Sequence, residues 1–517
     1  DNGLEQNSGV KTQPGGNINV NATGLVNLDN ANIKNTLRPG AEGKIGDVNI
    51  QANSLNLSNG SLISTIIAGT GSGGNIGITT TGDLSISGTN DLSRLNNNTT
   101  ALSSIITDTR GQGNAGKISI DTQNLGKLSL SNNAEISSST IGKNAVGNGG
   151  DISISAKSID LSNNSSITSD NVRAKGNAGN INIKTSGDIS ISGTTPQSTD
   201  PITLDSNLSS ISSDTLGQGN AGKITIDTQN IGKLSLFNRA SISNTISLNA
   251  LGNGNDIQIS AREIELRNAG SISSRTIRGS KGDAGNINIK TSGDIRISST
   301  TLQSTDPAAS TPTNISDITS STGGQGNAGK ITIDTQARGK LSLSNNGNIA
   351  SAIGPNGVGN GGSIAISARE IELQNEGFIF SSNVGGKGDA GNITINTTEN
   401  ITISGSTPQL GGSFIGSLTL GQGNAGKITI DTQARGKLSL LNRASITSTT
   451  DPSAMGNGGS IAISAKEIDL RNGSEIVSAN NGGQGNAGNI DLKTSGDISI
   501  SGSTPESTAP ITSKSTV

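Results

Sequence analysis

Carboxylates are the side chains of this chain that could do acid–base chemistry, because its 517 residues include no histidine and no cysteine. A histidine base, a thiolate nucleophile and the usual transition-metal sites are thereby excluded. Carboxylates alone can still cleave polysaccharides when two of them face one cleft. The repeated acids are Asp121, Asp227, Asp334, Asp431, Glu263, Glu265, Glu370, Glu372, Glu467 and Asp469, and the lysines interleaved with them are Lys117, Lys223, Lys330 and Lys427. Acids at equivalent places along a repeat do not converge, so we predict a solvated outer face and no enzyme.

The same repeats suggest two other kinds of site, a calcium site and an ice-binding surface. Gly147 to Ser155, GNGGDISIS, is similar to the calcium-binding nonapeptide, but serine replaces Asp151 in later repeats, at Ser363 and Ser460. We therefore predict no metal and no cofactor. Outward ranks of hydroxyls, at Ser119, Thr225, Thr332 and Thr429, would suit ice binding, although Asp, Lys and Glu interrupt them.

The segment from Gly113 to Thr140, GNAGKISIDTQNLGKLSLSNNAEISSST, shows which elements must position these residues. Ile and Leu alternate with Ser and Asp at 118–121 and 128–131, which predicts two short strands, and a third follows at 135–138. Gln, Asn and Gly between them favour tight turns. Three strands and two turns make one coil, which cannot bury its apolar side alone and needs neighbours stacked on both sides.

Those neighbours follow in a fixed order of three types. A coils begin at Gly116, Gly222, Gly329 and Gly426, B coils at Gly150, Asn255, Gly362 and Gly459, and C coils at Gly179, Gly285, Gly391 and Gly488. Three earlier coils begin at Gly16, Gly46 and Gly74. Five A-B-C triplets predict an all-β, right-handed parallel β-helix (β-solenoid) of about fifteen three-strand coils, in which the handedness follows the rule for parallel crossovers. We divide the chain into a polar lead-in at 1–14 and triplets at 15–110, 111–216, 217–323, 324–420 and 421–517.

Composition supports a thin coil rather than a thick globular core. The chain has 73 glycines, four phenylalanines and neither tryptophan nor tyrosine. Its net charge of -3 gives no electrostatic reason to bind nucleic acid, and no apolar run reaches the length of a membrane span.

An asparagine follows the second strand of every A and B coil: Asn30, Asn59, Asn132, Asn163, Asn238, Asn268, Asn345, Asn375, Asn442 and Asn472. C coils have Gly88, Gly193, Ser299, Gly405 and Gly502 there. Asn and Gly tolerate positive φ, and stacked amides can bond from coil to coil. We interpret these asparagines as a structural ladder rather than a ligand site.

Longer segments follow each C coil, at about 89–110, 194–216, 300–322, 406–420 and 503–517, and hold most of the prolines. Proline removes a donor from the strand ladder, so we expect these segments to leave the sheets as contact loops. The residues proposed for contact are Pro196, Asp200, Pro201, Asp306, Pro307, Pro408, Pro505 and Pro510. Recurring at every third coil, they would lie roughly 14 Å apart along one side.

The iterated GNAGNINI, GDISISG and LSLSNNAxISS phrases resemble the repeat region of filamentous-haemagglutinin-like exoproteins, especially the large two-partner-secretion proteins of cyanobacteria. The resemblance covers about Gly15 to Gly502. It implies export through an outer-membrane β-barrel partner and display at the cell surface, or release from it, for adhesion. The amino-terminal secretion domain of that family is not visible in this sequence.

From the sequence we therefore expect a secreted, non-enzymatic solenoid that forms a rigid stalk about 70 Å long and contacts an unknown cell-surface or matrix ligand through its loops. Two alternatives stay open. Bare solenoid ends would let copies stack into an extracellular filament, unless more coils follow in a longer chain. A polysaccharide-active β-helix enzyme would instead need carboxylates that converge in a groove.

Overall fold

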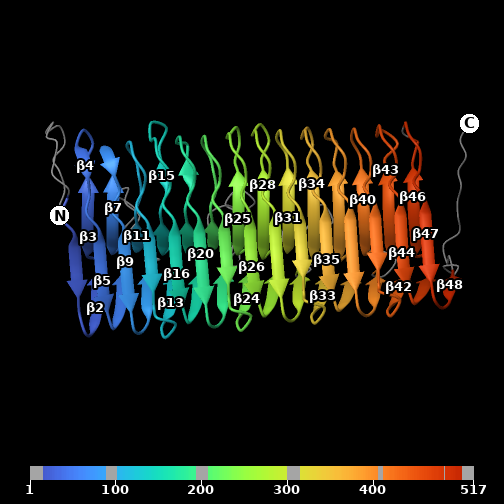
Figure 1. The fold of residues 1–517 in the computed structure, drawn as a ribbon, viewed down its shortest axis with the longest axis horizontal. Coiled ribbons are helices and arrows are strands. Elements are labelled where there is room, and N and C mark those ends of the chain that lie inside the picture. The colour runs from blue at the N-terminus through green and yellow to red at the C-terminus, as the bar shows by residue number, and fades with distance from the viewer. Residues whose placement is uncertain are drawn as a thin grey trace, which may run out of the picture.

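The computed structural model describes residues 15–88, 102–193, 208–299, 315–405, 412–482 and 484–502. In these ranges the chain forms strands and turns and no helix. The strands stack into three long parallel sheets, so the chain advances along one axis, with its described ends at opposite ends of the rod (Figure 1). The first two sheets have fifteen strands each and the third has fourteen, which confirms the predicted parallel β-solenoid.

The first sheet contains the strand that opens each coil. Its members are β1 (Ile18–Asn21), β5 (Val48–Ala52), β9 (Ile76–Thr80), β12 (Ile118–Asp121), β16 (Ile152–Ala156), β20 (Ile181–Thr185), β23 (Ile224–Asp227), β26 (Ile257–Ala261), β29 (Ile287–Thr291), β32 (Ile331–Asp334), β35 (Ile364–Ala368), β38 (Ile393–Thr397), β41 (Ile428–Asp431), β44 (Ile461–Ala465) and β47 (Ile490–Thr494).

The second sheet contains the strand that follows the first corner. Its members are β2 (Leu25–Asp29), β6 (Ser54–Ser58), β10 (Leu84–Ser87), β13 (Lys127–Ser131), β17 (Ser158–Ser162), β21 (Ile189–Ser192), β24 (Lys233–Phe237), β27 (Glu263–Arg267), β30 (Ile295–Ser298), β33 (Lys340–Ser344), β36 (Glu370–Gln374), β39 (Ile401–Ser404), β42 (Lys437–Leu441), β45 (Glu467–Arg471) and β48 (Ile498–Ser501).

The third sheet contains β3 (Asn32–Leu37), β7 (Leu62–Ile67), β11 (Ser104–Ile106), β14 (Glu135–Ser137), β18 (Ser166–Thr168), β22 (Ser210–Ser212), β25 (Ser241–Ile246), β28 (Ser271–Thr276), β31 (Asp317–Thr322), β34 (Asn348–Ile353), β37 (Phe378–Asn383), β40 (Phe414–Thr419), β43 (Ser445–Thr450) and β46 (Glu475–Asn480). Two short pairs complete the described strands: β4 (Glu42–Lys44) with β8 (Thr70–Ser72), and β15 (Thr140–Ile141) with β19 (Asn171–Val172).

The core consists of columns of identical or similar aliphatic side chains. Pairing in register places Ile118 beside Ile152 and Ile120 beside Ile154, and this alignment continues from coil to coil. Nearly all of these isoleucines and leucines are fully buried. Burying one aliphatic side chain contributes roughly 1.5–3 kcal/mol, a gain that a single coil obtains only when another coil covers it.

Buried hydroxyls close the other side of the interior. Ser138, in the third side of its coil, accepts a hydrogen bond from the Gly150 N–H at 2.9 Å and donates one to the Gly116 carbonyl at 2.8 Å. Ser213 repeats the arrangement with Gly222 and Gly179, both at 2.9 Å. These bonds satisfy polar groups that would otherwise be costly to bury, and they tie each third strand to the start of its neighbours.

The extent of the insertions was predicted wrongly. The first four segments expected to leave the sheets after a C coil each contain that coil's third strand, β11, β22, β31 or β40, and the fifth, 503–517, lies outside the described residues. In β11, for example, Ile105 lies in register with Ile63 and Ile136. The pattern hid these strands because each one has a single fully buried isoleucine and lacks the alternating pair of buried aliphatic residues found in the first two sheets. The insertions therefore lie inside the C coils, at the corner between the second and third strands, and not after them.

Candidate contact surface

The outward side chains of the third sheet depart from the triplet repeat. We call them the third-sheet face. They are the side chains at the first, third and fifth positions of each third strand, counted from the residue that aligns with Ser104. At the first position the successive residues are Asn32, Leu62, Ser104, Glu135, Ser166, Ser210, Ser241, Ser271, Asp317, Asn348, Phe378, Phe414, Ser445 and Glu475, of which Glu135, Ser241, Asn348 and Ser445 belong to A coils of the second to fifth triplets. By contrast, every A coil from the second triplet on ends its first strand with aspartate, at Asp121, Asp227, Asp334 and Asp431. A surface that only needed to fold would not require such differences between coils.

Four acids from consecutive coils gather in one part of this face. We call Asp108, Glu135, Asp170 and Asp214 the acid pocket. A depression of about 380 Å³ lies there, and its lining includes Glu135, Asp170, Ser166, Thr168, Ser210 and Ser212. Leu102 and Leu208, which lie just after the first two insertions, also line it. The insertions therefore return to the solenoid at the rim of this pocket.

Three carboxylates of the acid pocket accept backbone N–H groups that would otherwise bond to backbone carbonyls of the neighbouring strand. Asp108 accepts the Ser139 N–H at 3.0 Å, Asp170 accepts the Asp214 N–H at 2.8 Å, and Asp214 accepts the Thr245 N–H at 2.6 Å. The third strands here have three residues, whereas β25 and the later ones have six. A side-chain acceptor in place of a backbone carbonyl explains the shorter strands.

Burial shifts the titration of all four acids. It raises the pKa of Asp108 to about 6 and that of Asp214 to about 6. Burial, with a further contribution from the nearby Asp108 charge, raises the pKa of Glu135 to about 7. Burial and the Asp214 charge raise the pKa of Asp170 well above its usual range. A carboxyl group with a pKa near 7 can act as a proton donor at neutral pH.

An aromatic patch occupies the same face further along the rod. It contains three of the four phenylalanines in the chain, Phe378, Phe380 and Phe414. The Phe414 ring lies 4.8 Å from that of Phe378 and 5.9 Å from that of Phe380, measured between centroids. Gly416 leaves room for it, because a Cβ there would lie 3.0 Å from the Phe414 ring. These half-buried rings point outward and so add nothing to the solenoid core.

The predicted corner asparagines share one backbone conformation. All ten have positive φ, between 46° and 57°. Their amides connect coils within a triplet: Asn163 donates to Asn132 at 3.2 Å, Asn268 to Asn238 at 3.2 Å, and Asn472 to Asn442 at 2.9 Å. Glycine or serine interrupts the series in every C coil, so these bonds form pairs and not one continuous ladder.

A continuous ladder exists at another corner, which the sequence analysis missed. It contains Asn114, Asn148, Asn177, Asn220, Asn253, Asp283, Asn327, Asn360, Asp389, Asn424, Asn457 and Asn486. In each step a side-chain oxygen accepts the backbone N–H of the next member, at 2.6 to 3.1 Å. The signal was an Asn or Asp directly after a glycine in each coil from Asn114 on, a series that includes the segment compared with a calcium motif.

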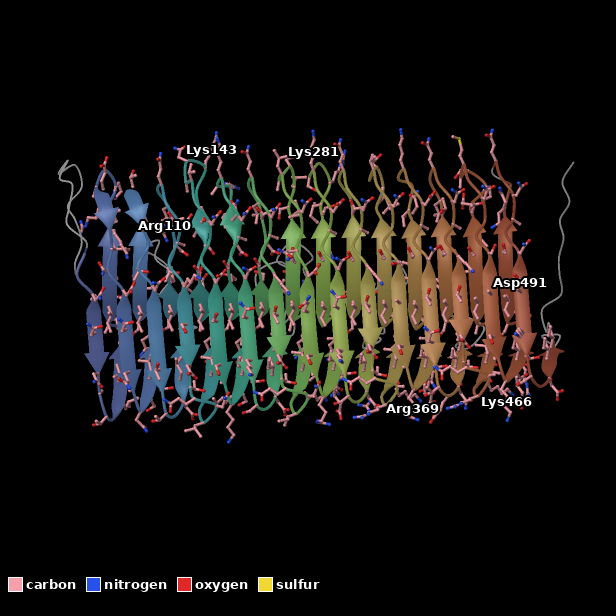
Figure 2. All side chains as sticks on the ribbon, in the orientation of Figure 1. Arg110, Lys143, Lys281, Arg369, Lys466 and Asp491 are labelled. Carbon is pink, nitrogen blue, oxygen red and sulfur yellow. The ribbon has the colours of Figure 1, made fainter. Side chains whose placement is uncertain are left out.

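The repeated acids stabilise the regular strands and turns of the solenoid, which we call the frame. Asp227 caps its own turn by accepting the Gln229 N–H at 2.7 Å. Acids of the B coils pair across the second sheet with A-coil lysines, as in Lys127 with Asp160 at 3.0 Å and Lys437 with Asp469 at 2.8 Å. Of the lysines predicted to interleave, Lys117 pairs with Asp151 at 3.3 Å. Figure 2 shows further charged side chains, Lys143 and Lys281 at one edge and Arg369 and Lys466 at the opposite edge.

All the residues proposed for contact in the insertions lie outside the described residues. Within the described ranges, no three acidic side chains stand close enough to hold a metal ion together. No helix long and apolar enough to span a membrane occurs in those ranges either.

No known family matches this chain, and no curated protein matches its sequence.

Proposed function

We propose that this chain is a rigid extracellular rod that adheres to cells or matrix through its third-sheet face. The observation that carries the proposal is the contrast between this irregular face and the regular frame beneath it. Aromatic side chains displayed on a solenoid surface are typical of contact sites rather than of folding. The likeness of the repeats to those of filamentous-haemagglutinin-like exoproteins supports secretion through an outer-membrane partner and a place at the cell surface.

Adhesion of coated beads to a panel of bacterial and animal cells tests the proposal. The variant Phe378→Ser/Phe380→Ser/Phe414→Ser removes the aromatic patch and introduces serine, the commonest residue of this face. The control Leu125→Ser/Ile231→Ser/Leu248→Ser removes three apolar side chains that are 63%, 59% and 62% exposed on other parts of the rod. We expect the first variant to reduce the number of attached beads at least about tenfold and the control to leave it within about twofold. Equal loss in both variants, or no adhesion by the wild type, contradicts the proposal.

The insertions can be tested with the strands left intact. Deleting 194–207 and changing Gly193→Asn and Leu208→Asn would recreate the Asn-Asn-Ser corner found at 163–165. Because β22 is retained, we expect the variant to fold with unchanged far-ultraviolet circular dichroism and to adhere less well. A variant that folds and adheres as the wild type does would exclude this insertion from contact.

The acid pocket favours a second candidate function, cleavage of a polysaccharide by paired carboxyl groups. Asp170, whose pKa is raised well above its usual range, would protonate the leaving oxygen, and Glu135 on the preceding coil, with a pKa of about 7, would be the ionised second carboxylate above neutral pH. Release of reducing ends from a polysaccharide panel, lost in Glu135→Gln, would support this function. No release by the wild type would eliminate it.

A further inference from the structure

The outer face of the first sheet contains two similar depressions one triplet apart. The first has a volume of about 420 Å³ and extends from β12 to β23; the second has about 410 Å³ and extends from β23 to β32. Thr225 and Asp227 line both of them. Together they make one shallow groove across seven coils, about 29 Å long when each coil rises by about 4.8 Å. We call this the first-sheet groove.

Polar side chains of alternate residues line the groove. The outward residues at the second strand position are Ser119, Ser153, Asn182, Thr225, Gln258, Asn288 and Thr332. In the described part of the chain these seven side chains form no hydrogen bond, although all are exposed or half-exposed. The same column does bond elsewhere, since Asn49 donates to Asn19 at 3.0 Å in the first triplet. The groove thus presents donors and acceptors that are accessible from outside and are not bonded to other described side chains.

The charges of the groove alternate and nearly balance. Lys184 lies beside Asp227 in register, and Lys290 lies beside Asp334 in the same way. Asp121 completes the set at the amino-terminal end. A nucleic acid or another polyanion would meet these carboxylates as well as the two lysines, so charge disfavours it. A chain of uncharged, hydroxyl-bearing units would meet both donors and acceptors along the whole length.

We infer that the first-sheet groove binds an extended, uncharged polysaccharide that lies along the rod axis. The two depressions share Asn, Ser and Lys at equivalent positions (Asn182 and Asn288, Ser155 and Ser260, Lys184 and Lys290), so one polymer can make similar contacts twice, which multiplies weak contacts. The groove is on a different sheet from the aromatic patch and the acid pocket. This inference and the proposed adhesive function can therefore fail separately.

Native gel electrophoresis through soluble polysaccharides tests the inference. The gels contain hydroxyethyl cellulose, xylan, dextran or laminarin, and alginate or heparin serve as charged comparisons. The variant Asn182→Ala/Gln258→Ala/Asn288→Ala removes three groove amides that have no side-chain partner among the described residues. The control Gln218→Ala/Gln325→Ala/Gln422→Ala removes three exposed amides from the ridge that follows the third sheet.

We expect at least one neutral polysaccharide to retard the wild-type protein. The apparent Kd should rise at least about tenfold in the groove variant and less than about twofold in the control. The inference is overturned if no neutral polysaccharide retards the wild type, or if the groove variant is retarded as strongly as the control. Retardation by alginate or heparin alone, abolished by salt, overturns it as well.

Discussion

The first and third sheets are built from the same coils, yet their outer faces follow different rules. On the first sheet, aspartate recurs at the strand end in Asp121, Asp227, Asp334 and Asp431. On the third sheet, the same A coils begin the strand with Glu135, Ser241, Asn348 and Ser445 in turn, and phenylalanine begins it in one B coil and one C coil. Both sheets enclose the same columns of isoleucine and leucine, so the fold does not require the difference. Outward residues can therefore vary between coils without changing the core, and such residues can bind a partner.

A glycine of the shared frame provides the strongest test of this contrast. Gly326 has φ of +146°, and a Cβ there would lie 2.1 Å from the Gly282 carbonyl oxygen. Gly326→Ala should therefore reduce the free energy of unfolding by about 2–4 kcal/mol, measured by chemical denaturation. Gly354→Ala is the matched control, because its nearest contact would be 3.5 Å away, and it should change stability by less than about 0.5 kcal/mol. Similar values for the two would show that the frame is less constrained than described.

The acid pocket should give the third-sheet face a pH dependence that the frame lacks. Because the folded-state pKa values of Asp108, Asp214 and Glu135 are raised to about 6, 6 and 7, the folded protein holds protons that the unfolded chain has released. The stability that these three groups contribute is therefore fully present below about pH 4 and is lost as pH rises from about 4 to 7. We expect the Tm to fall by about 2–5 °C over this range.

The variant Glu135→Gln tests whether the acid pocket, rather than the total charge of the protein, causes the pH dependence of the Tm. It should raise the Tm relative to wild type at pH 8 and leave it nearly unchanged at pH 4.5, because only the ionised carboxylate is costly to bury. Glu475→Gln, at the equivalent but exposed position of β46, should leave the profile unchanged. If the Tm of wild type and of Glu135→Gln depended on pH in the same way, Glu135 would not cause the pH dependence.

The corner asparagines should show a smaller effect. Asn163 has φ of 52°, a left-handed backbone conformation that glycine adopts without a steric penalty. Asn163→Gly should therefore be nearly neutral, whereas Asn163→Ala should cost about 1 kcal/mol through its left-handed backbone. Thermal unfolding of the two variants measures the difference. Equal losses would mean that the amide bond, and not the backbone, makes asparagine necessary.

The sequence allowed the frame to be predicted because the frame repeats. Alternating isoleucines identified most strands, and the corner asparagines identified the turns with positive φ. The third strands of the C coils were hidden because each has one buried isoleucine, such as Ile105, and no second buried aliphatic residue two positions away. The continuous ladder through Asn148 was missed because its glycine-rich motif was weighed only as a calcium site.

The third-sheet face could not be predicted in the same way. Asp108, Glu135, Asp170 and Asp214 occur at positions that no repeat marks, and they become neighbours only when four coils stack. Phe378 and Phe414 are 36 residues apart and meet through strand pairing. A search for single departures from the repeat at outward positions of the third strand would have found all of them, provided that strand had been recognised.

Oxidative footprinting of the rod bound to cells measures most directly where contact occurs. Hydroxyl radicals label accessible side chains, and mass spectrometry compares the bound and the free protein. Our account predicts that labelling of Phe378, Phe380 and Phe414 falls on binding, while labelling of Met455 and Leu125, 50% and 63% exposed on other sides, stays the same. Protection of Met455 or Leu125 with the phenylalanines unchanged would contradict it.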